Sequence, residues 1–104
     1  MLEELLGTKL RALYQRSKGR DMYDLYKAMT GIKIDTDKLI QCYNEYMKFA
    51  VDKPPTQRQF LLNIEEKLYD SEFLGDTKAL FRTDEEYNPH VAWELIKKEL
   101  ILKI

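Results

Sequence analysis

Apolar residues recur at intervals of three and four along most of the chain, a spacing that places them on one face of an α-helix. The pattern predicts a first helix from about residue 2 to about residue 17, which ends at Lys18-Gly19. A second helix is predicted from Arg20 or Asp21 to Thr30-Gly31, with Gly31 as the residue after the last turn. The expected inward positions of these two helices are Leu2, Leu5, Leu6, Lys9, Leu10, Leu13, Met22, Leu25, Tyr26 and Met29.

Capping signals mark the start of two further helices. Asp35-Thr36-Asp37 supplies side-chain oxygens and negative charge for a third helix, which ends before Pro54-Pro55. Thr56 and Gln59 match a capping box, which predicts a fourth helix. The expected buried positions are Leu39, Ile40, Tyr43, Tyr46, Met47, Ala50, Phe60, Leu61, Ile64 and Leu68.

The last third of the chain has weaker signals followed by one strong one. We expect a short helical turn at Thr77 to Phe81 and an exposed acidic loop at Asp84-Glu85-Glu86. Asn88-Pro89 then predicts a final helix from Pro89 to nearly Ile104. Its apolar residues fall on two faces, one with Trp93, Ile96, Leu100 and Ile104 and another with Val91, Leu95 and Leu102. We expect the second face to contact a surface outside these 104 residues, either a second copy or another domain.

The composition fits one small helical domain. A chain of 104 residues with four Gly, three Pro and helical spacing throughout predicts a single all-α bundle of five to six helices over residues 1–104. The net charge of −1 predicts no global attraction to nucleic acid or anionic membranes. A single cysteine excludes an intrachain disulfide, and no apolar run is long enough to span a bilayer, so we expect a soluble cytoplasmic protein.

Lys9 and two aspartates are the main candidates for chemistry. Lys9 lies within an apolar stripe, where a buried ammonium group needs a partner. Asp21 and Asp24 are three residues apart on the second helix, and a short connection allows them to approach the first helix. The structural alternatives are a lysine whose ammonium reaches solvent, and acidic residues that stabilise a helix N-terminus.

Other groups are typical of structural roles. Asp35-Thr36-Asp37 has the spacing of a metal-binding pair, but no Gly-rich loop precedes it and helix capping explains both carboxylates. His90 has no second His or nearby Cys, and Cys42 has no adjacent basic cluster. The sequence therefore predicts no metal site in this chain.

Two motifs at the first helix-helix connection resemble a known family. Lys9-Leu10-Arg11-Ala12-Leu13, then Arg16, then Arg20-Asp21-Met22-Tyr23-Asp24-Leu25 are similar to the K-L-x-A-L…R…R-D-x-x-D-L signature of AbiEii/AbiGii-type nucleotidyltransferase toxins. The similarity covers residues 3 to 26 well, and the helical remainder is compatible with the C-terminal half of that family. Proteins of this family have an N-terminal α/β core with a Gly-Ser motif and a D-x-D metal pair. Some are toxins opposed by a cognate antitoxin, in phage defence or toxin–antitoxin operons.

The resemblance implies a role for each motif residue. Lys9 falls at the position that binds nucleotide phosphate, with Arg16 and Arg20 as further nucleotide-binding candidates. Asp21 falls at the catalytic position, with Asp24 as a second catalytic candidate. Mg²⁺ and a nucleoside triphosphate are implied for the full-length protein, and none for this chain, because no Gly-Ser loop or D-x-D pair precedes Lys9. We therefore expect a helical C-terminal part that needs an N-terminal nucleotidyltransferase core and is inactive alone.

Two alternatives come from other functional classes. One is a stand-alone interaction module that forms a homodimer or larger homo-oligomer, in which Lys9 and Asp21 are structural. The other is nucleic-acid binding through the basic first hairpin, which contains Lys9, Arg11, Arg16, Lys18 and Arg20, with Tyr14 among them.

Overall fold

The computed structural model describes residues 2–50, 53–76 and 87–104, and all regular structure in these ranges is helical. The elements are α1 (Leu2–Gln15), α2 (Gly19–Gly31), α3 (Thr36–Ala50), α4 (Gln57–Lys67), α5 (Ser71–Gly75), α6 (Pro89–Glu99) and the 3₁₀ turn η2 (Ile101–Lys103). The all-α bundle is therefore confirmed. The turn expected at Thr77 to Phe81 and the acidic loop at Asp84-Glu85-Glu86 lie outside the described residues.

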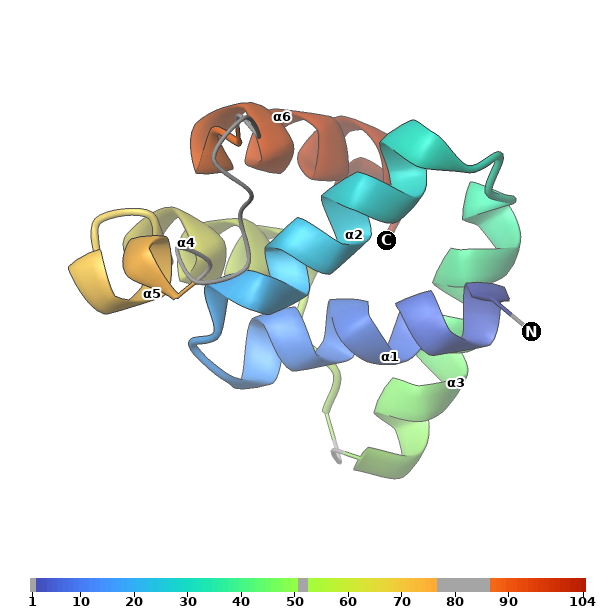
Figure 1. The fold of residues 1–104 in the computed structure, drawn as a ribbon. Coiled ribbons are helices and arrows are strands. Elements are labelled where there is room, and N and C mark those ends of the chain that lie inside the picture. The colour runs from blue at the N-terminus through green and yellow to red at the C-terminus, as the bar shows by residue number, and fades with distance from the viewer. Residues whose placement is uncertain (1, 51–52, 77–86) are drawn as a thin grey trace.

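The first two helices form the centre of the arrangement. Figure 1 shows α1 and α2 side by side, with α2 between α1 and α6. Helix α3 crosses α1 and forms the most extensive helix-helix packing in the described chain, while α4 and α5 lie near the α1–α2 turn.

The capping signals have the expected structural effect. Thr56 Oγ1 accepts a hydrogen bond from Gln59 N at 3.1 Å, and Gln59 Oε1 accepts one from Thr56 N at 2.9 Å, which completes the capping box. Asp35 Oδ1 accepts from Lys38 N at 3.1 Å at the start of α3. Asn88 Oδ1 accepts from the amide of His90 at 2.9 Å before α6. Each cap satisfies an amide that the helix itself leaves without a partner.

The core consists of apolar side chains from all six α-helices and η2. Its fully or nearly fully buried members are Leu6, Leu10, Leu13, Met22, Leu25, Leu39, Ile40, Tyr43, Met47, Phe60, Ile64, Leu68, Phe73, Ala92, Trp93, Ile96, Leu100 and Ile101. Three positions expected to be buried are instead on the surface, since Leu5 is 57% exposed, Tyr46 is 39% exposed and Ala50 is exposed. The apolar stripes of α1 and α3 are wider than the surface that each helix buries against its neighbours.

The end of α6 differs from the prediction. The α-helix stops at Glu99 rather than near Ile104, and Leu100 has φ −120° and ψ −55° before η2. This change of backbone geometry buries the consecutive residues Leu100 and Ile101 together, each 0% exposed. Of the second apolar face, Val91 and Leu102 are each 54% exposed, but Leu95 is only partly exposed and Leu102 belongs to η2 rather than to α6.

Two glycines decide how closely helices approach, whereas Gly31 does not have the role expected for it. A Cβ added to Gly19 would collide with the carbonyl oxygen of Phe73, so this position brings α2 directly against α5. A Cβ on Gly7 would lie 3.0 Å from the backbone nitrogen of Tyr43, where α1 crosses α3. Gly31 is the last residue of α2 rather than the residue after it, and Ile32 follows it in an extended conformation. No described glycine has a positive φ.

Candidate functional site

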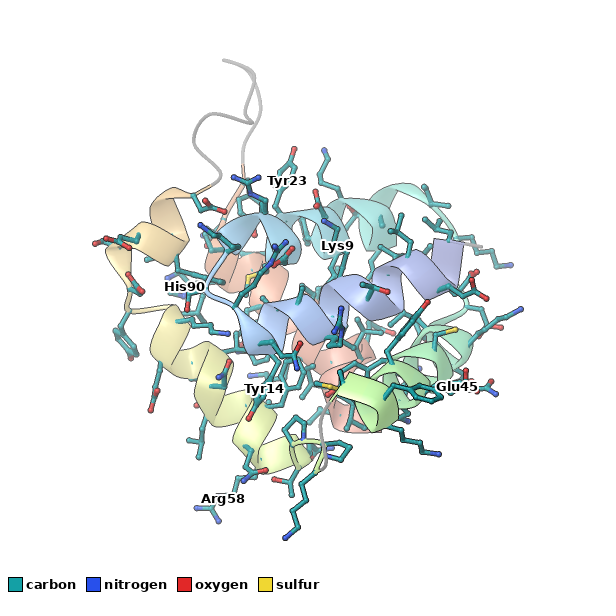
Figure 2. The ribbon with its side chains drawn as sticks, turned by 90° about the horizontal axis from the view of Figure 1, so that it is seen from below. Lys9, Tyr14, Tyr23, Glu45, Arg58 and His90 are labelled. Atoms are coloured by element: carbon teal, nitrogen blue, oxygen red, sulfur yellow. The ribbon has the colours of Figure 1, made fainter. Side chains whose placement is uncertain are left out.

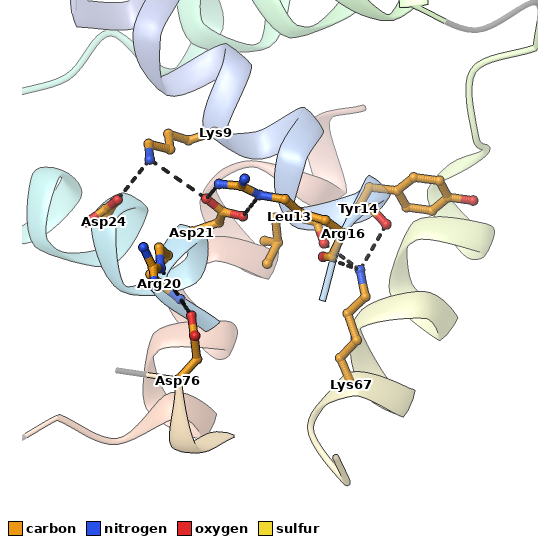
Figure 3. A network of polar contacts seen from close by, with 9 residues as sticks. All are labelled: Lys9, Leu13, Tyr14, Arg16, Arg20, Asp21, Asp24, Lys67 and Asp76. Carbon is orange, nitrogen blue, oxygen red and sulfur yellow. Dashed lines mark hydrogen bonds and ion pairs between the residues drawn. The ribbon is translucent and has the colours of Figure 1, made fainter. Parts of the chain in front are cut away.

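The α1–α2 hairpin brings four of the five predicted site residues into one polar network. Lys9 and Arg16 come from α1 and the residue after it, and Asp21 and Asp24 come from α2 (Figure 3). Lys9, in the middle of α1, pairs with Asp24, in the middle of α2, and Arg16, just after α1, pairs with Asp21, near the start of α2, as expected for antiparallel helices joined by a short connection. We call these four side chains the hairpin charge cluster.

Asp21 is the buried centre of the hairpin charge cluster. Its side chain is 0% exposed, and it is the one charged side chain in the buried set of the described residues. Arg16 Nε donates to Asp21 Oδ2 at 2.8 Å and Arg16 Nη2 donates to Oδ1 at 2.9 Å, a bidentate pair. The hydrogen bond to Asp21, together with its charge, raises the pKa of Arg16. Because both carboxylate oxygens are engaged and enclosed, Asp21 is placed to position neighbouring cations rather than to touch a substrate.

Lys9 lies at the solvent edge of the same network. Its Nζ is 3.1 Å from Asp24 Oδ2 and 3.8 Å from Asp21 Oδ1. The Lys9 side chain is 29% exposed and that of Asp24 is 41% exposed. The stem of Lys9 therefore packs between the two helices while its ammonium group reaches solvent between two carboxylates. Lys9 therefore combines the two geometries considered from the sequence, an ammonium group paired with aspartates and an ammonium group that reaches solvent.

Arg20 belongs to a separate ion pair. Its backbone amide donates to Asp76 Oδ2 at 3.1 Å, and its Nε lies 3.3 Å from the same oxygen. The amide hydrogen bond is the main reason that the pKa of Asp76 is lowered, with further contributions from the Arg20 side chain and from Lys18. Asp76 thus caps the N-terminus of α2, and the Arg20 guanidinium is turned toward α5 rather than toward Lys9 (Figure 3).

Lys67 and Asp76 are structural partners of the site that the sequence analysis missed. Lys67 Nζ donates to the carbonyl oxygens of Leu13, Tyr14 and Arg16 at 2.6, 2.9 and 3.1 Å, and so satisfies the C-terminal end of α1. Burial lowers the pKa of Lys67 to about 8. These contacts join residues more than 50 positions apart, and no local pattern in the sequence indicates them.

The other basic residues of the hairpin do not form a continuous binding face. Lys18 is exposed, and Arg11 has a buried Nε without a hydrogen-bond partner in the described structure. The Tyr14 ring packs against Phe60 with centroids 5.2 Å apart, so one side of it is covered. Since Lys9, Arg16 and Arg20 are each paired with aspartate, much of the positive charge of the hairpin is locally neutralised.

The described carboxylates do not form a divalent-metal site. Asp35 is used as a helix cap, and the Asp37 side chain is 90% exposed with Lys103 Nζ 3.7 Å from its Oδ1. Within residues 2–50, 53–76 and 87–104, no three His, Cys, Asp or Glu side chains are grouped so that they could hold a metal ion. The resemblance places Mg²⁺ in the full-length protein rather than in these residues, and we assign the described residues no metal-dependent step. None of the described helices is both long and apolar enough to cross a bilayer.

Comparison with known proteins supports the resemblance seen in the motif residues. The model of a family described as "Nucleotidyl transferase AbiEii toxin, Type IV TA system" matches residues 1–97, which include the whole α1–α2 hairpin. Searches of curated proteins and of solved structures gave no match. Because the family model covers most of its length, this chain belongs to the AbiEii nucleotidyl transferase toxin family.

Proposed function

We propose that this chain is the helical C-terminal part of an AbiEii-type nucleotidyltransferase and that its α1–α2 hairpin forms one side of a nucleotide site. Lys9 supplies positive charge to a phosphate group of the nucleotide. The observation that carries the proposal is the position of Lys9, whose partly exposed ammonium group is held at the seam by two carboxylates of the family motif.

The carboxylates and the arginines have different roles in this proposal. Asp21 is buried and bound by Arg16, so it orients Lys9 and Arg16 instead of contacting substrate. Asp24 is partly exposed and holds Lys9 until a phosphate oxygen takes its place. Arg16, with a side chain 52% exposed, is close enough to the seam to add a second positive charge. Arg20 contributes only after its pair with Asp76 opens.

The metal-binding part and the remaining contacts to the triphosphate are proposed to lie in a nucleotidyltransferase core outside the described helices. The described residues lack a grouped set of metal ligands, so the helical part alone is expected not to transfer a nucleotide. Membership in a toxin family makes a cognate antitoxin a natural partner. A cytoplasmic location and a role in phage defence belong to the same proposal.

A phosphate-binding measurement tests the role of Lys9. ATP is titrated into the isotope-labelled chain, and amide chemical shifts are followed by NMR. Lys9→Gln should weaken ATP binding by about tenfold, which corresponds to about 1.4 kcal/mol. Asp24→Asn should strengthen binding, because it removes the carboxylate that competes with phosphate for Lys9.

The control is Lys98→Gln, which removes the same charge from an exposed position on α6. An equal loss of affinity in both lysine variants would mean that ATP responds only to net charge, and the proposal would fail. A separate assay of the 104-residue chain for Mg²⁺-dependent nucleotide transfer should give no product, and robust turnover would overturn the requirement for a separate core.

The exposed second face of α6 supports an alternative function as a homo-oligomeric interaction module. Leu95 lines a cavity of about 290 Å³ with Met29 and Ile32 at the α2–α6 boundary, and Val91 and Leu102 are exposed on α6 and η2. Light scattering after size-exclusion chromatography should show a concentration-dependent dimer that Val91→Glu dissociates. A monomer at all concentrations would remove this alternative.

A further inference from the structure

The outer face of α3 carries exposed aromatic rings. Phe49 is 92% exposed and Tyr46 is 39% exposed, and their spacing of three residues places both rings on the same side of the helix. A single exposed apolar side chain needs no explanation, but neighbouring rings beside a cavity are typical of a surface that binds a partner. The hairpin charge cluster uses neither of these residues.

A cavity of about 200 Å³ lies beside these rings, between α1 and α3. We call it the α1–α3 hollow, and its lining residues are Glu4, Cys42, Glu45, Tyr46 and Phe49. Figure 2 shows Glu45 at the surface of α3, and Lys9 lies along the other side of α1 with its contacts to α2. Gly7 allows the backbone of α1 to approach Tyr43 and Cys42 closely, where the two helices cross beside the hollow.

The chemistry of the hollow selects a cation. Among the described residues that line it, the charged ones are Glu4 and Glu45. Glu4 already interacts with another group of the protein, so the inference uses the carboxylate of Glu45. Such a surface repels the phosphates of nucleic acids and anionic lipids. A guanidinium group fits better than an ammonium group, because it stacks on Tyr and Phe rings and donates paired hydrogen bonds to a carboxylate. We infer that the α1–α3 hollow binds an arginine side chain presented by a partner protein.

The exposed ring of Phe49 indicates a protein rather than a small cation. A free amino acid or polyamine in the hollow would leave most of this ring in water, because the ring extends beyond the cavity that it lines. A protein segment with apolar residues on either side of its arginine would cover the ring as well. Arginine and aromatic residues are also enriched at the centres of protein interfaces. The inference is independent of the proposed nucleotide site, because it uses a different surface of α1.

A capped pentapeptide with a central arginine between leucines is the probe. Titration into the isotope-labelled chain should shift amide signals of the first half of α1 and the second half of α3. A peptide with citrulline in place of arginine keeps the shape but loses the charge, and it should bind at least about tenfold more weakly. The lysine peptide should bind with intermediate affinity, because it lacks the planar group.

Two pairs of variants separate the hollow from general surface effects. Glu45→Gln and Phe49→Ala change exposed side chains, so the fold should persist, and each should weaken the arginine peptide at least about fivefold. Glu66→Gln and Leu62→Ala make comparable changes at exposed positions on α4 that line no described cavity, and they should alter affinity less than about twofold.

Four results would each overturn the inference. The first is the absence of arginine-peptide binding up to about 5 mM. The second is equal binding of the citrulline peptide or of the Glu45→Gln variant. The third is binding of free arginine as tight as that of the peptide, which would indicate a small-molecule site. The fourth is a dimer of this chain that Phe49→Ala dissociates, because a second copy would then occupy the surface.

Discussion

Removing Arg16 should destabilise the fold more than neutralising Asp21, although Arg16 is the more exposed member of the pair. The Arg16 side chain is 52% exposed and that of Asp21 is 0% exposed. Arg16→Met leaves a buried carboxylate with Lys9 Nζ 3.8 Å away, and a buried charge without its partner typically costs about 3–5 kcal/mol. Because Lys9 remains, we expect a loss near the lower end, about 3 kcal/mol. Asp21→Asn retains a hydrogen-bond acceptor and leaves a guanidinium that water can solvate, so its cost should be about 1–2 kcal/mol.

Urea unfolding monitored by circular dichroism and by the fluorescence of buried Trp93 measures these differences. The double variant should cost less than the sum of the single variants, with a coupling of at least about 1 kcal/mol, because Asp21→Asn removes the charge that Arg16→Met leaves uncompensated. Arg58→Met, at an exposed position on α4, is the matched control and should change stability by less than about 0.5 kcal/mol. Additive single effects, or a larger loss for Asp21→Asn, would refute the asymmetry.

Three further predictions concern the structure around the site. Gly19→Ala should cost about 2 kcal/mol in urea unfolding because the new methyl collides with the Phe73 carbonyl, whereas Gly31→Ala, with open space around it, should not destabilise. Burial lowers the pKa of Lys67 from 10.5 to about 8, so between these values the unfolded state binds more protons and stability should rise with pH. Thermal unfolding at several pH values should show this rise in the wild type but not in Lys67→Met. Asp76 has a lowered pKa, mainly through a backbone amide of α2, so its contribution is present above the unfolded pKa of about 3.9 and is lost as pH falls through the folded value. The stability difference between wild type and Asp76→Asn should therefore be largest near neutral pH and disappear in strong acid.

Much of the candidate site could be expected from local sequence. A connection of a few residues between two amphipathic helices favours antiparallel packing, which brings Lys9 near Asp21 and Asp24. The spacing of Arg16 and Asp21 across the same turn allows their bidentate pair. The sequence did not indicate that Asp21 would be fully enclosed, because enclosure depends on how the helices pack around it.

The sequence by itself determined the five longer helices and nearly all of their starts, because capping hydrogen bonds and the 3.6-residue period involve neighbours along the chain. It did not predict the short helix α5 at Ser71–Gly75. It also indicated that Val91 on α6 and Leu102 in η2 would lie outside the core, and both are exposed. Only the tertiary structure decided which parts of the apolar stripes are buried, and it left Leu5 and Tyr46 at the surface. It also decided that Lys67 and Asp76 complete the two ends of the α1–α2 turn, because those contacts require α4 and α5 to dock from more than 50 residues away. Local energetics select helices, but the docking of distant helices selects which charges are enclosed and which face solvent.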